Sequence, residues 1–194
     1  RNGMDQNNLR IRPSVKNDAP VRVFTLWKDG GYIFGKNGLP IARVATCDIK
    51  GDINTVADKY VDIKHRKDWD RTADDTYSSV SKDDGVAYSY FKGKAGWLVP
   101  ARDFVFTQVE LPPGVVNISD IQARVIFNRD CHDKLPLGRA IRGEQNSLLI
   151  LQSGGLHKTK VTMLTECDPK GWANIFGTGT MDWLVGDSTV QVIK

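Results

Sequence analysis

The stretch KHRKDWDR, residues 64–71, holds six formally charged side chains, one histidine and one tryptophan. A charged run of this kind is typical either of a solvated surface or of a basic patch that grips phosphate. Nucleic-acid binding calls for a basic stripe with interleaved aromatic residues, but Asp68 and Asp70 stand where the phosphates would have to lie. We therefore predict no nucleic-acid partner, and ask whether some of these charges point into a drier place.

The histidines give no catalytic constellation. An activated nucleophile needs a base beside it, and no histidine has an evident serine or cysteine partner. Cys131 and His132 are adjacent, but adjacent residues of a strand point to opposite faces, which argues against a dyad. We therefore predict no enzyme and no catalytic residue. The three histidines are His65, His132 and His157.

Composition bounds the class of protein. The 194 residues suffice for one ordinary domain, and 40% hydrophobic with 26% charged residues is typical of a soluble globular chain. The net charge of +4 suits an anionic membrane surface or nucleic acid without selecting either. Apolar runs such as residues 148–151 are far too short to span a bilayer.

The cysteines Cys47, Cys131 and Cys167 are odd in number and show no zinc-ligand spacing. We therefore expect buried thiols in a reducing compartment, with no metal and no cofactor.

Periodicity predicts one α+β domain at residues 21–194 after an irregular lead-in at residues 1–20, where Pro13 and Pro20 act as breakers. Apolar residues at helical spacing, with Asp52 as N-cap, predict an amphipathic helix over residues 53–66. From residue 76 onward, alternation and turn signals indicate a long antiparallel meander. The predicted strands are 21–27, 32–34, 41–49, 76–81, 86–92, 104–111, 121–128, 140–151 and 158–167.

A last segment, residues 172–185, has roughly helical spacing, although its glycines weaken a helix. A strongly twisted sheet of this length tends to curl, and a helix can then close its concave side over a cavity. A solid core fits the same periodicity equally well.

Four segments, in this order and spacing, resemble the START family of lipid-transfer domains. Residues 66–70 have the form R-x-x-W-D, and residues 102–105 read R-D-F-V. Residues 135–143 resemble the P…G-x-I-R-G strand entry, and residues 159–172 resemble T-x-V-T…D-P-K-G-W. Together the segments cover roughly residues 25–185.

The resemblance implies a helix-grip fold. In this fold a curved antiparallel sheet wraps around a long C-terminal helix, and the two enclose a hydrophobic tunnel that holds one lipid. The resemblance also implies a cytoplasmic carrier that touches membranes transiently and moves one lipid between them. Because buried apolar surface is worth about 25 cal/mol per Å², an acyl chain needs such a lining to leave the bilayer. A lipid-sensing module and an acyl-CoA thioesterase are the alternatives within related folds.

Two departures from the family pattern concern its C-terminal end. Ala173-Asn174 stands where the family usually has a proline soon after D-P-K-G-W, and the last helix is glycine-rich. The family's N-terminal helix is not evident either. We therefore expect a shorter or looser lid over the tunnel.

The resemblance assigns the polar end of the tunnel by position. In the phosphatidylcholine-binding member, the arginine and aspartate of R-x-x-W-D lie near the head group, which transfers to Arg66 and Asp70, with an upstream tyrosine at Tyr60. A guanidinium can fork onto a phosphate while the carboxylate orients it. The alternative is that Arg66 and Asp70 pair only with each other and cap the helix end. Trp69 is predicted as a core anchor, and four neighbours are expected in solvent: Lys64, Lys67, Asp68 and Arg71.

The choline cage of that member is only partly present. Phe104 fills one aromatic position, whereas the others fall on Thr72, Ser89 and Asn146. A glycerophospholipid is therefore favoured without choline selectivity.

Sterol-binding members place an acid–arginine pair in the tunnel where this chain has Ser89 and Gln108, so that charge pair is absent. Strand alternation puts Arg102, Phe104, Phe106 and Gln108 on one face, which we take as the cavity face. Sterol and ceramide remain alternatives, ceramide through amide and hydroxyl side chains. The predicted lipid-binding residues are Tyr60, Arg66, Asp70, Ser89, Phe104, Phe106, Gln108 and Asn146.

Overall fold

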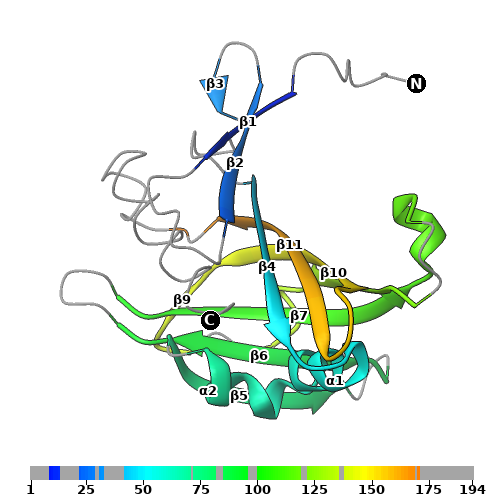
Figure 1. The fold of residues 1–194 in the computed structure, drawn as a ribbon. Helices are drawn as coiled ribbons and strands as arrows, with labels where there is room; N and C mark the ends of the chain where they lie inside the picture. Colours follow the sequence, from blue (N-terminus) through cyan, green and yellow to red (C-terminus); the bar gives the residue numbers. More distant parts are fainter. Residues whose placement is uncertain are drawn as a thin grey trace.

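The computed structural model describes residues 9–13, 22–28, 31–32, 42–70, 72–81, 85–95, 100–118, 122–135, 138–168 and 170. Within them, eleven strands form one sheet in the order β1-β2-β4-β11-β10-β8-β7-β6-β5, with β3 paired to β2 and β9 to β7 (Figure 1). All pairings are antiparallel except the short β7–β9 pair. The antiparallel meander predicted from residue 76 onward is therefore confirmed in β5 to β11, and β4 joins it by pairing with β11.

The strands follow the predicted segments closely. The alternating apolar residues and the glycine-containing turns between them were sufficient to place nearly every strand. The strands are β1 Leu9–Pro13, β2 Arg22–Lys28, β3 Gly31–Tyr32, β4 Ala42–Lys50, β5 Ala73–Val80, β6 Ala87–Gly93, β7 Arg102–Leu111, β8 Arg124–Asp130, β9 Ile141–Arg142, β10 Glu144–Ser153 and β11 Lys158–Asp168.

Strand β1 corrects the expectation of an irregular lead-in at residues 1–20. Leu9–Pro13 pairs with β2 in the register Leu9↔Lys28 to Pro13↔Phe24. The sequence LRIRP alternates with a period of two, and β1 is an edge strand. Proline is tolerated at such an edge because its missing N–H removes no interior ladder bond, so Pro13 ends a strand here and does not prevent one.

The helix predicted at 53–66 is divided into three pieces. Helix α1 spans Ile53–Val61 and begins at Asp52, whose carboxylate accepts a hydrogen bond from Thr55 N at 3.0 Å. It ends at Asp62, where the backbone becomes extended and the carboxylate caps a new 3₁₀ turn, η2, at Ile63–His65. Helix α2, Arg66–Trp69, follows at once.

One face of the sheet, here called the α1 face, packs against α1 (Figure 1). Ala57 is fully buried against it, and Ile53, Val56 and Tyr60 pack around it. The core below them comes from β4, β8, β10 and β11: Ala45, Cys47, Ile126, Leu149, Leu151, Val161 and Met163.

The opposite face carries a separate core. Tyr88, Tyr90 and Val105 are buried there and pack with Cys131 and Leu135 from the connection after β8. A short 3₁₀ turn, η3, spans Pro113–Val116 between β7 and β8. No helix within the described residues is long and apolar enough to cross a membrane. The terminal helix predicted at 172–185 lies outside the described residues.

Candidate functional site: the α1 face of the sheet

A groove of about 240 Å³ runs between α1 and the sheet. Its floor is apolar, because the register Leu149↔Met163 and Leu151↔Val161 brings four side chains of β10 and β11 to one face. Val56 forms part of the α1 wall. The remaining lining residues are Ile49, Lys50, Thr55, Lys59, Tyr60 and Trp69.

Trp69 lines the groove and joins α2 to α1. Its ring stacks on Tyr60 with centroids 5.7 Å apart, and its indole N–H donates to the carbonyl of Lys59 at 3.1 Å. The predicted anchor therefore packs between helices and also lines the groove. Lys64, Lys67 and Asp68 are exposed, as predicted. Arg71 lies outside the described residues.

Arg66 and Asp70 form a buried ion pair at the end of α2. The Nε of Arg66 donates to Asp70 Oδ2 at 2.8 Å, and the two side chains are 9% and 1% exposed. The other oxygen of Asp70 accepts from the backbone N–H and the hydroxyl of Thr72, at 3.0 and 2.5 Å. The pairing that the sequence left open is therefore made, and Asp70 also ties α2 to the start of β5.

The guanidinium of Arg66 lies between aromatic rings. Its Cζ is 4.2 Å from the ring centroid of Phe91 and 4.9 Å from that of Trp69. Such cation–π contacts hold the group in a dry environment. Within the described residues, the terminal Nη atoms have no hydrogen-bond partner, so two donor nitrogens remain for a ligand oxygen.

Phe104 and Phe106 lie beside this pair on the α1 face. Both are buried in one cluster with Ile63, Ala73 and Phe91, and Phe104 stacks on Phe91 with centroids 6.0 Å apart. Ser89 is 9% exposed and opposes Phe106 in the β6–β7 register, which places it on the same face. The structure therefore brings the predicted aromatic and serine positions together with Arg66.

The α1 face also carries a row of polar residues that the sequence motifs did not predict. Asn128, Ser147 and Thr165 are adjacent across β8, β10 and β11 and are 5%, 3% and 8% exposed. The amide of Asn128 donates to Ser147 Oγ at 2.9 Å and to the hydroxyl of Tyr60 at 3.1 Å. The signal was a single polar residue in each alternating apolar series, as in Val161-Met163-Thr165.

Two atoms of this row are buried without a hydrogen-bond partner, Asn128 Oδ1 and Thr165 Oγ1. Unpaired buried polar atoms are costly and point to strain, water or a ligand. Gln108 opposes Asn128 in the β7–β8 register, so the predicted Gln108 position lies next to the row. The α1 face therefore combines apolar surface with a neutral polar centre.

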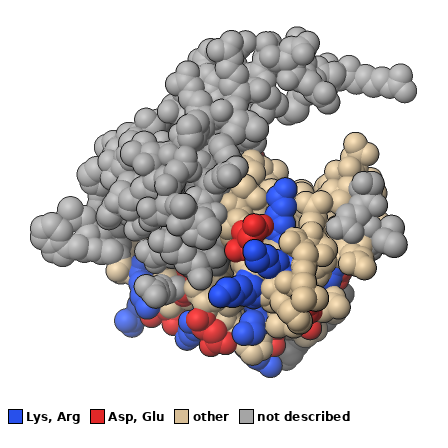
Figure 2. Space-filling view, viewed as in Figure 1, with Lys and Arg blue, Asp and Glu red and all other residues tan. Residues whose placement is uncertain are grey.

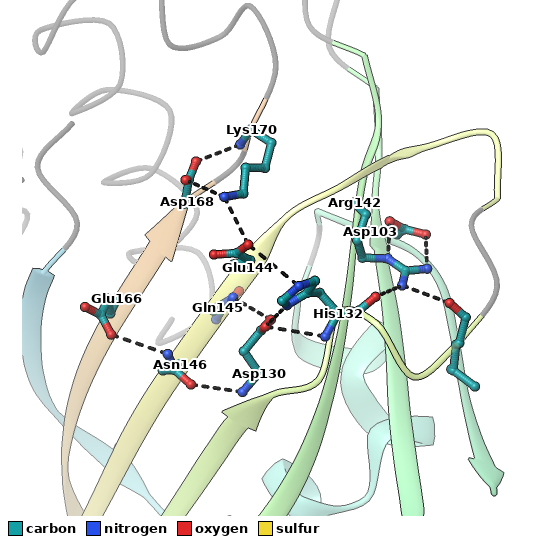
Figure 3. Close-up of polar contacts among 11 residues, drawn as sticks. Asp103, Asp130, His132, Arg142, Glu144, Gln145, Asn146, Glu166, Asp168 and Lys170 are labelled. Atoms are coloured by element: carbon teal, nitrogen blue, oxygen red, sulfur yellow. Dashed lines mark hydrogen bonds and ion pairs between the residues drawn. The ribbon is translucent and has the colours of Figure 1, made fainter. Parts of the chain in front are cut away.

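Asn146 does not join the other predicted residues. Its neighbour Ser147 points to the α1 face, so Asn146 points to the opposite one. Its carbonyl accepts from the backbone of Asp130 at 2.9 Å, and its amide lies 3.4 Å from Glu166 (Figure 3). The sequence alone could not show which alternate residues of β10 face α1, because this depends on the register with β8.

The motif residues Asp103 and Arg142 form a second buried pair, on the opposite face (Figure 3). Arg142 is bidentate to the carboxylate at 2.8 and 3.1 Å, and its Nη1 donates to the carbonyls of His132 and Leu135. Burial, followed by the charge of Asp103, raises the pKa of Tyr90 to about 12. These motif residues therefore hold the connection after β8 against the sheet.

His132 belongs to a neighbouring surface cluster. Its Nδ1 lies 2.5 Å from Asp130 Oδ2, and its Nε2 lies 3.9 Å from Glu144, which also pairs with Lys170 (Figure 3). The hydrogen bond with Asp130 raises the pKa of His132, and the charges of Asp130 and Glu144 add to the effect. Burial raises the pKa of the adjacent Cys131 thiol, which does not favour a reactive thiolate.

The sequence matches no family model and no curated protein. Three solved structures resemble this fold closely. The human StarD13 lipid transfer and protein localization domain has a TM-score of 0.69 at 15% identity, covering 95% of this chain and 87% of its own. Human StAR-related lipid transfer protein 5 has a TM-score of 0.70 at 16% identity, covering 97% and 84%.

A STAR-related lipid transfer protein from Xanthomonas axonopodis has a TM-score of 0.65 at 16% identity, covering 95% of this chain and 92% of its own. At these identities the likeness shows the fold. The chain has a START-like, helix-grip fold, as the sequence motifs predicted.

Proposed function

We propose that this chain binds one lipid on the α1 face of its sheet and carries it between membranes. The observation that carries the proposal is the apolar groove between α1, β10 and β11. A lined groove replaces the bilayer as solvent for an acyl chain. The neighbouring folds are described as lipid-transfer domains, which supports the same activity. We propose a cytoplasmic carrier that touches membranes peripherally and performs no catalysis.

The groove accommodates part of a lipid. Its volume of about 240 Å³ is below the roughly 300–1,000 Å³ of pockets that enclose a whole ligand. Its apolar floor suits an acyl segment, and the cluster around Phe91 and Phe104 extends the apolar surface toward Arg66. The lipid would therefore lie along the α1 face, with its polar end near α2 or near the row around Asn128.

A glycerophospholipid is the first candidate ligand, and Arg66 supports it. The Nε of Arg66 is used by Asp70, but a phosphate oxygen can accept from the Nη atoms. The ion pair keeps the guanidinium oriented. The carboxylate of Asp70 offsets the positive charge of Arg66, so the pair as a whole is nearly neutral.

A hydroxyl-bearing lipid, such as a sterol or ceramide, is the second candidate. It is favoured by the unpartnered Asn128 Oδ1, which accepts and cannot donate. A hydroxyl or amide N–H can donate to this atom, whereas phosphate and ester oxygens cannot. A lipid carrier and a lipid-sensing module would each bind lipid at this same site.

A matched pair of substitutions in α1 tests the groove. Val56 lines it, and Val61, in the same helix, does not. We expect Val56→Trp to fill the groove and lower vesicle-to-vesicle lipid transfer several-fold, while Val61→Trp leaves transfer near the wild-type rate. Equal transfer by both variants would contradict the proposal, and measurable acyl-CoA hydrolysis would favour an enzyme instead.

The ligand class is tested by the lipids that transfer. Arg66→Lys should weaken transfer of phosphatidylcholine if the phosphate lies at Arg66, because an ammonium cannot reproduce the guanidinium fork. Asn128→Leu should weaken transfer of cholesterol more than of cholest-4-en-3-one, which lacks the hydroxyl, if that group lies at Asn128. A selective loss of phosphatidylcholine transfer in Arg66→Lys would identify the ligand as a phospholipid. A selective loss of cholesterol transfer in Asn128→Leu would identify it as a hydroxyl-bearing lipid.

A further inference from the structure

The hairpin between β10 and β11 presents an apolar side chain to solvent. Leu156 is 89% exposed, the highest value among the large hydrophobic side chains of the described residues. It sits in a tight connection in which Gly154 N donates to Lys158 O at 2.9 Å. Gly155 and His157 take positive φ angles of 109° and 55°, which turn the chain around Leu156. Leu156 therefore forms the tip of the hairpin.

This tip is fixed to the start of α1. Gly51 N donates to His157 O at 2.9 Å, and the buried hydroxyl of Thr159 donates to Gly51 O at 2.8 Å. Gly51 itself has a φ of 140°, which suits glycine. These hydrogen bonds join the hairpin to the segment between β4 and α1, which places Leu156 near the start of α1.

Four lysines lie on the elements that meet at this end of the sheet: Lys50 at the end of β4, Lys158 and Lys160 on β11, and Lys59 on α1. Because Val161 and Met163 pack on the α1 face, strand alternation puts Lys158 and Lys160 on the opposite face. Lys158 opposes Lys50 directly in the β4–β11 register, and all four are exposed. None makes an ion pair with another described residue, whereas Lys92 and Lys170 elsewhere are paired with carboxylates. Figure 2 shows Lys and Arg side chains gathered over the part of the surface where Figure 1 draws β4 and β11.

The acidic residues nearby do not cancel this charge. Asp48 is exposed and opposes Lys160 in the register, and Asp52 is occupied by the N-terminus of α1, where Thr55 donates to both of its oxygens. Beside Lys59, the exposed Asp58 pairs with Arg124 at 3.4 Å and Asp62 accepts from Lys64 N at 3.0 Å, so other groups engage both carboxylates. An apolar tip at an end of the sheet that carries unpaired lysines on both faces is complementary to an anionic bilayer, where leucine enters the interface and lysines meet lipid phosphates.

We propose that this surface, made of Leu156 with Lys50, Lys59, Lys158 and Lys160, is where the protein docks on an anionic membrane. Lys50 and Lys59 also line the groove, so the docked protein holds the groove next to the lipid that it takes up. The coupling to lipid uptake rests on the proposed carrier function, whereas the docking itself does not. The occupant is a lipid bilayer with negative surface charge.

Vesicle flotation with the full chain tests the docking surface. We expect binding to vesicles of phosphatidylcholine with phosphatidylserine, weak binding to phosphatidylcholine alone, and a decline with added salt. The double variant Lys158→Glu/Lys160→Glu should bind the anionic vesicles at least about tenfold more weakly, since each lysine near such a surface contributes appreciably. Leu156→Ser should also weaken binding to the anionic vesicles. The loss that it causes should depend less on salt than the loss caused by the lysine substitutions.

Matched changes elsewhere provide the controls. Lys64→Glu reverses an exposed lysine on η2, and Val115→Ser removes an exposed apolar side chain on η3. Both should bind anionic vesicles like the wild type. The proposal is overturned if the hairpin variants bind as the controls do, or if the wild type binds neutral and anionic vesicles equally.

Lipid uptake separates the two proposals. With lipid supplied from cyclodextrin in place of vesicles, Lys158→Glu/Lys160→Glu should load as much lipid as the wild type, because neither lysine lines the groove. If the wild type docks through the hairpin but never loads lipid, the docking surface stands and the carrier function fails. Loss of loading in the double variant would overturn the assignment of these lysines to docking alone.

Discussion

Two buried arginine–aspartate pairs lie on opposite faces of the same sheet and are built differently. Arg66 and Asp70, four residues apart, share one contact at 2.8 Å, and the guanidinium lies on the rings of Phe91 and Trp69. Asp103 and Arg142, 39 residues apart, share two contacts, and Arg142 also donates to two backbone carbonyls. The first pair leaves the Nη atoms of Arg66 without a partner among the described residues, whereas the second uses its donors inside the protein.

The difference teaches that a conspicuous motif and a functional site need not coincide. Asp103 belongs to R-D-F-V and Arg142 to the I-R-G strand entry, and both act by closing the opposite face. Arg66 uses aromatic faces in place of hydrogen bonds for much of its support. We propose that the Asp103–Arg142 pair maintains the fold and that the Arg66 side contacts the ligand of the proposed carrier.

The largest effect is expected from Asp103→Ala. It leaves the Arg142 guanidinium buried without its carboxylate, and breaking such a pair typically costs about 3–5 kcal/mol. We expect the urea midpoint to fall far enough to threaten folding at room temperature. A loss below about 1 kcal/mol would show that the pair does not hold the fold.

The same substitution in both pairs sharpens the comparison. Arg142→Lys loses the bidentate contact and the carbonyl contacts, so we expect it to lower the free energy of unfolding by about 2–3 kcal/mol, at about 1 kcal/mol per net hydrogen bond. Arg66→Lys should cost less and should chiefly alter lipid transfer. Urea melts of both variants decide the order, and an equal or greater cost at Arg66 would contradict the assignment.

Gly143, next to Arg142, sets the position of Phe104. A Cβ there would lie 2.4 Å from Cε1 of the Phe104 ring. We expect Gly143→Ala to destabilise the fold by about 1–3 kcal/mol, as overpacking does. In the background of Phe104→Leu, the cost of Gly143→Ala should shrink markedly. An unchanged cost in a double-mutant cycle would remove Phe104 as the cause.

The smallest effect concerns pH. The pKa of His132 is raised by Asp130, so the stability that this contact adds is fully present below the unfolded pKa of about 6.5. It is lost as pH rises through the higher folded pKa. Because His132 is half exposed, we expect this contact to add about 0.5 kcal/mol to the free energy of unfolding.

Urea melts of His132→Asn should therefore fall below the wild type in mildly acidic buffer and approach it at alkaline pH. His157→Asn is the control, because His157 is exposed with no ion pair among the described residues. A deficit of His132→Asn that stays constant with pH would contradict the titration.

Much of the fold could be predicted because its signals are local. Alternation in β10 and β11, the Gly-Gly turn between them and the Asp52 cap each lie within one segment. The break at Asp62 was missed because apolar spacing continues through Ile63 across it. Strand β1 was missed because Pro13 indicates a break unless the strand is known to lie at an edge.

The site could be predicted only where it is local. Arg66 and Asp70 meet because they are four residues apart, and the resemblance pointed to them. The polar row at Asn128, Ser147 and Thr165 depends on the register of three strands, which no single segment specifies. The same register put Asn146 on the other face.

Native mass spectrometry of the protein purified from cells tests the central claim most directly. We predict that the wild-type chain retains one lipid per molecule, that Val61→Trp retains it, and that Val56→Trp loses most of it, because only Val56 lines the groove. A wild-type protein that carries no lipid and takes none up from vesicles, or a Val56→Trp variant loaded like Val61→Trp, would contradict the account.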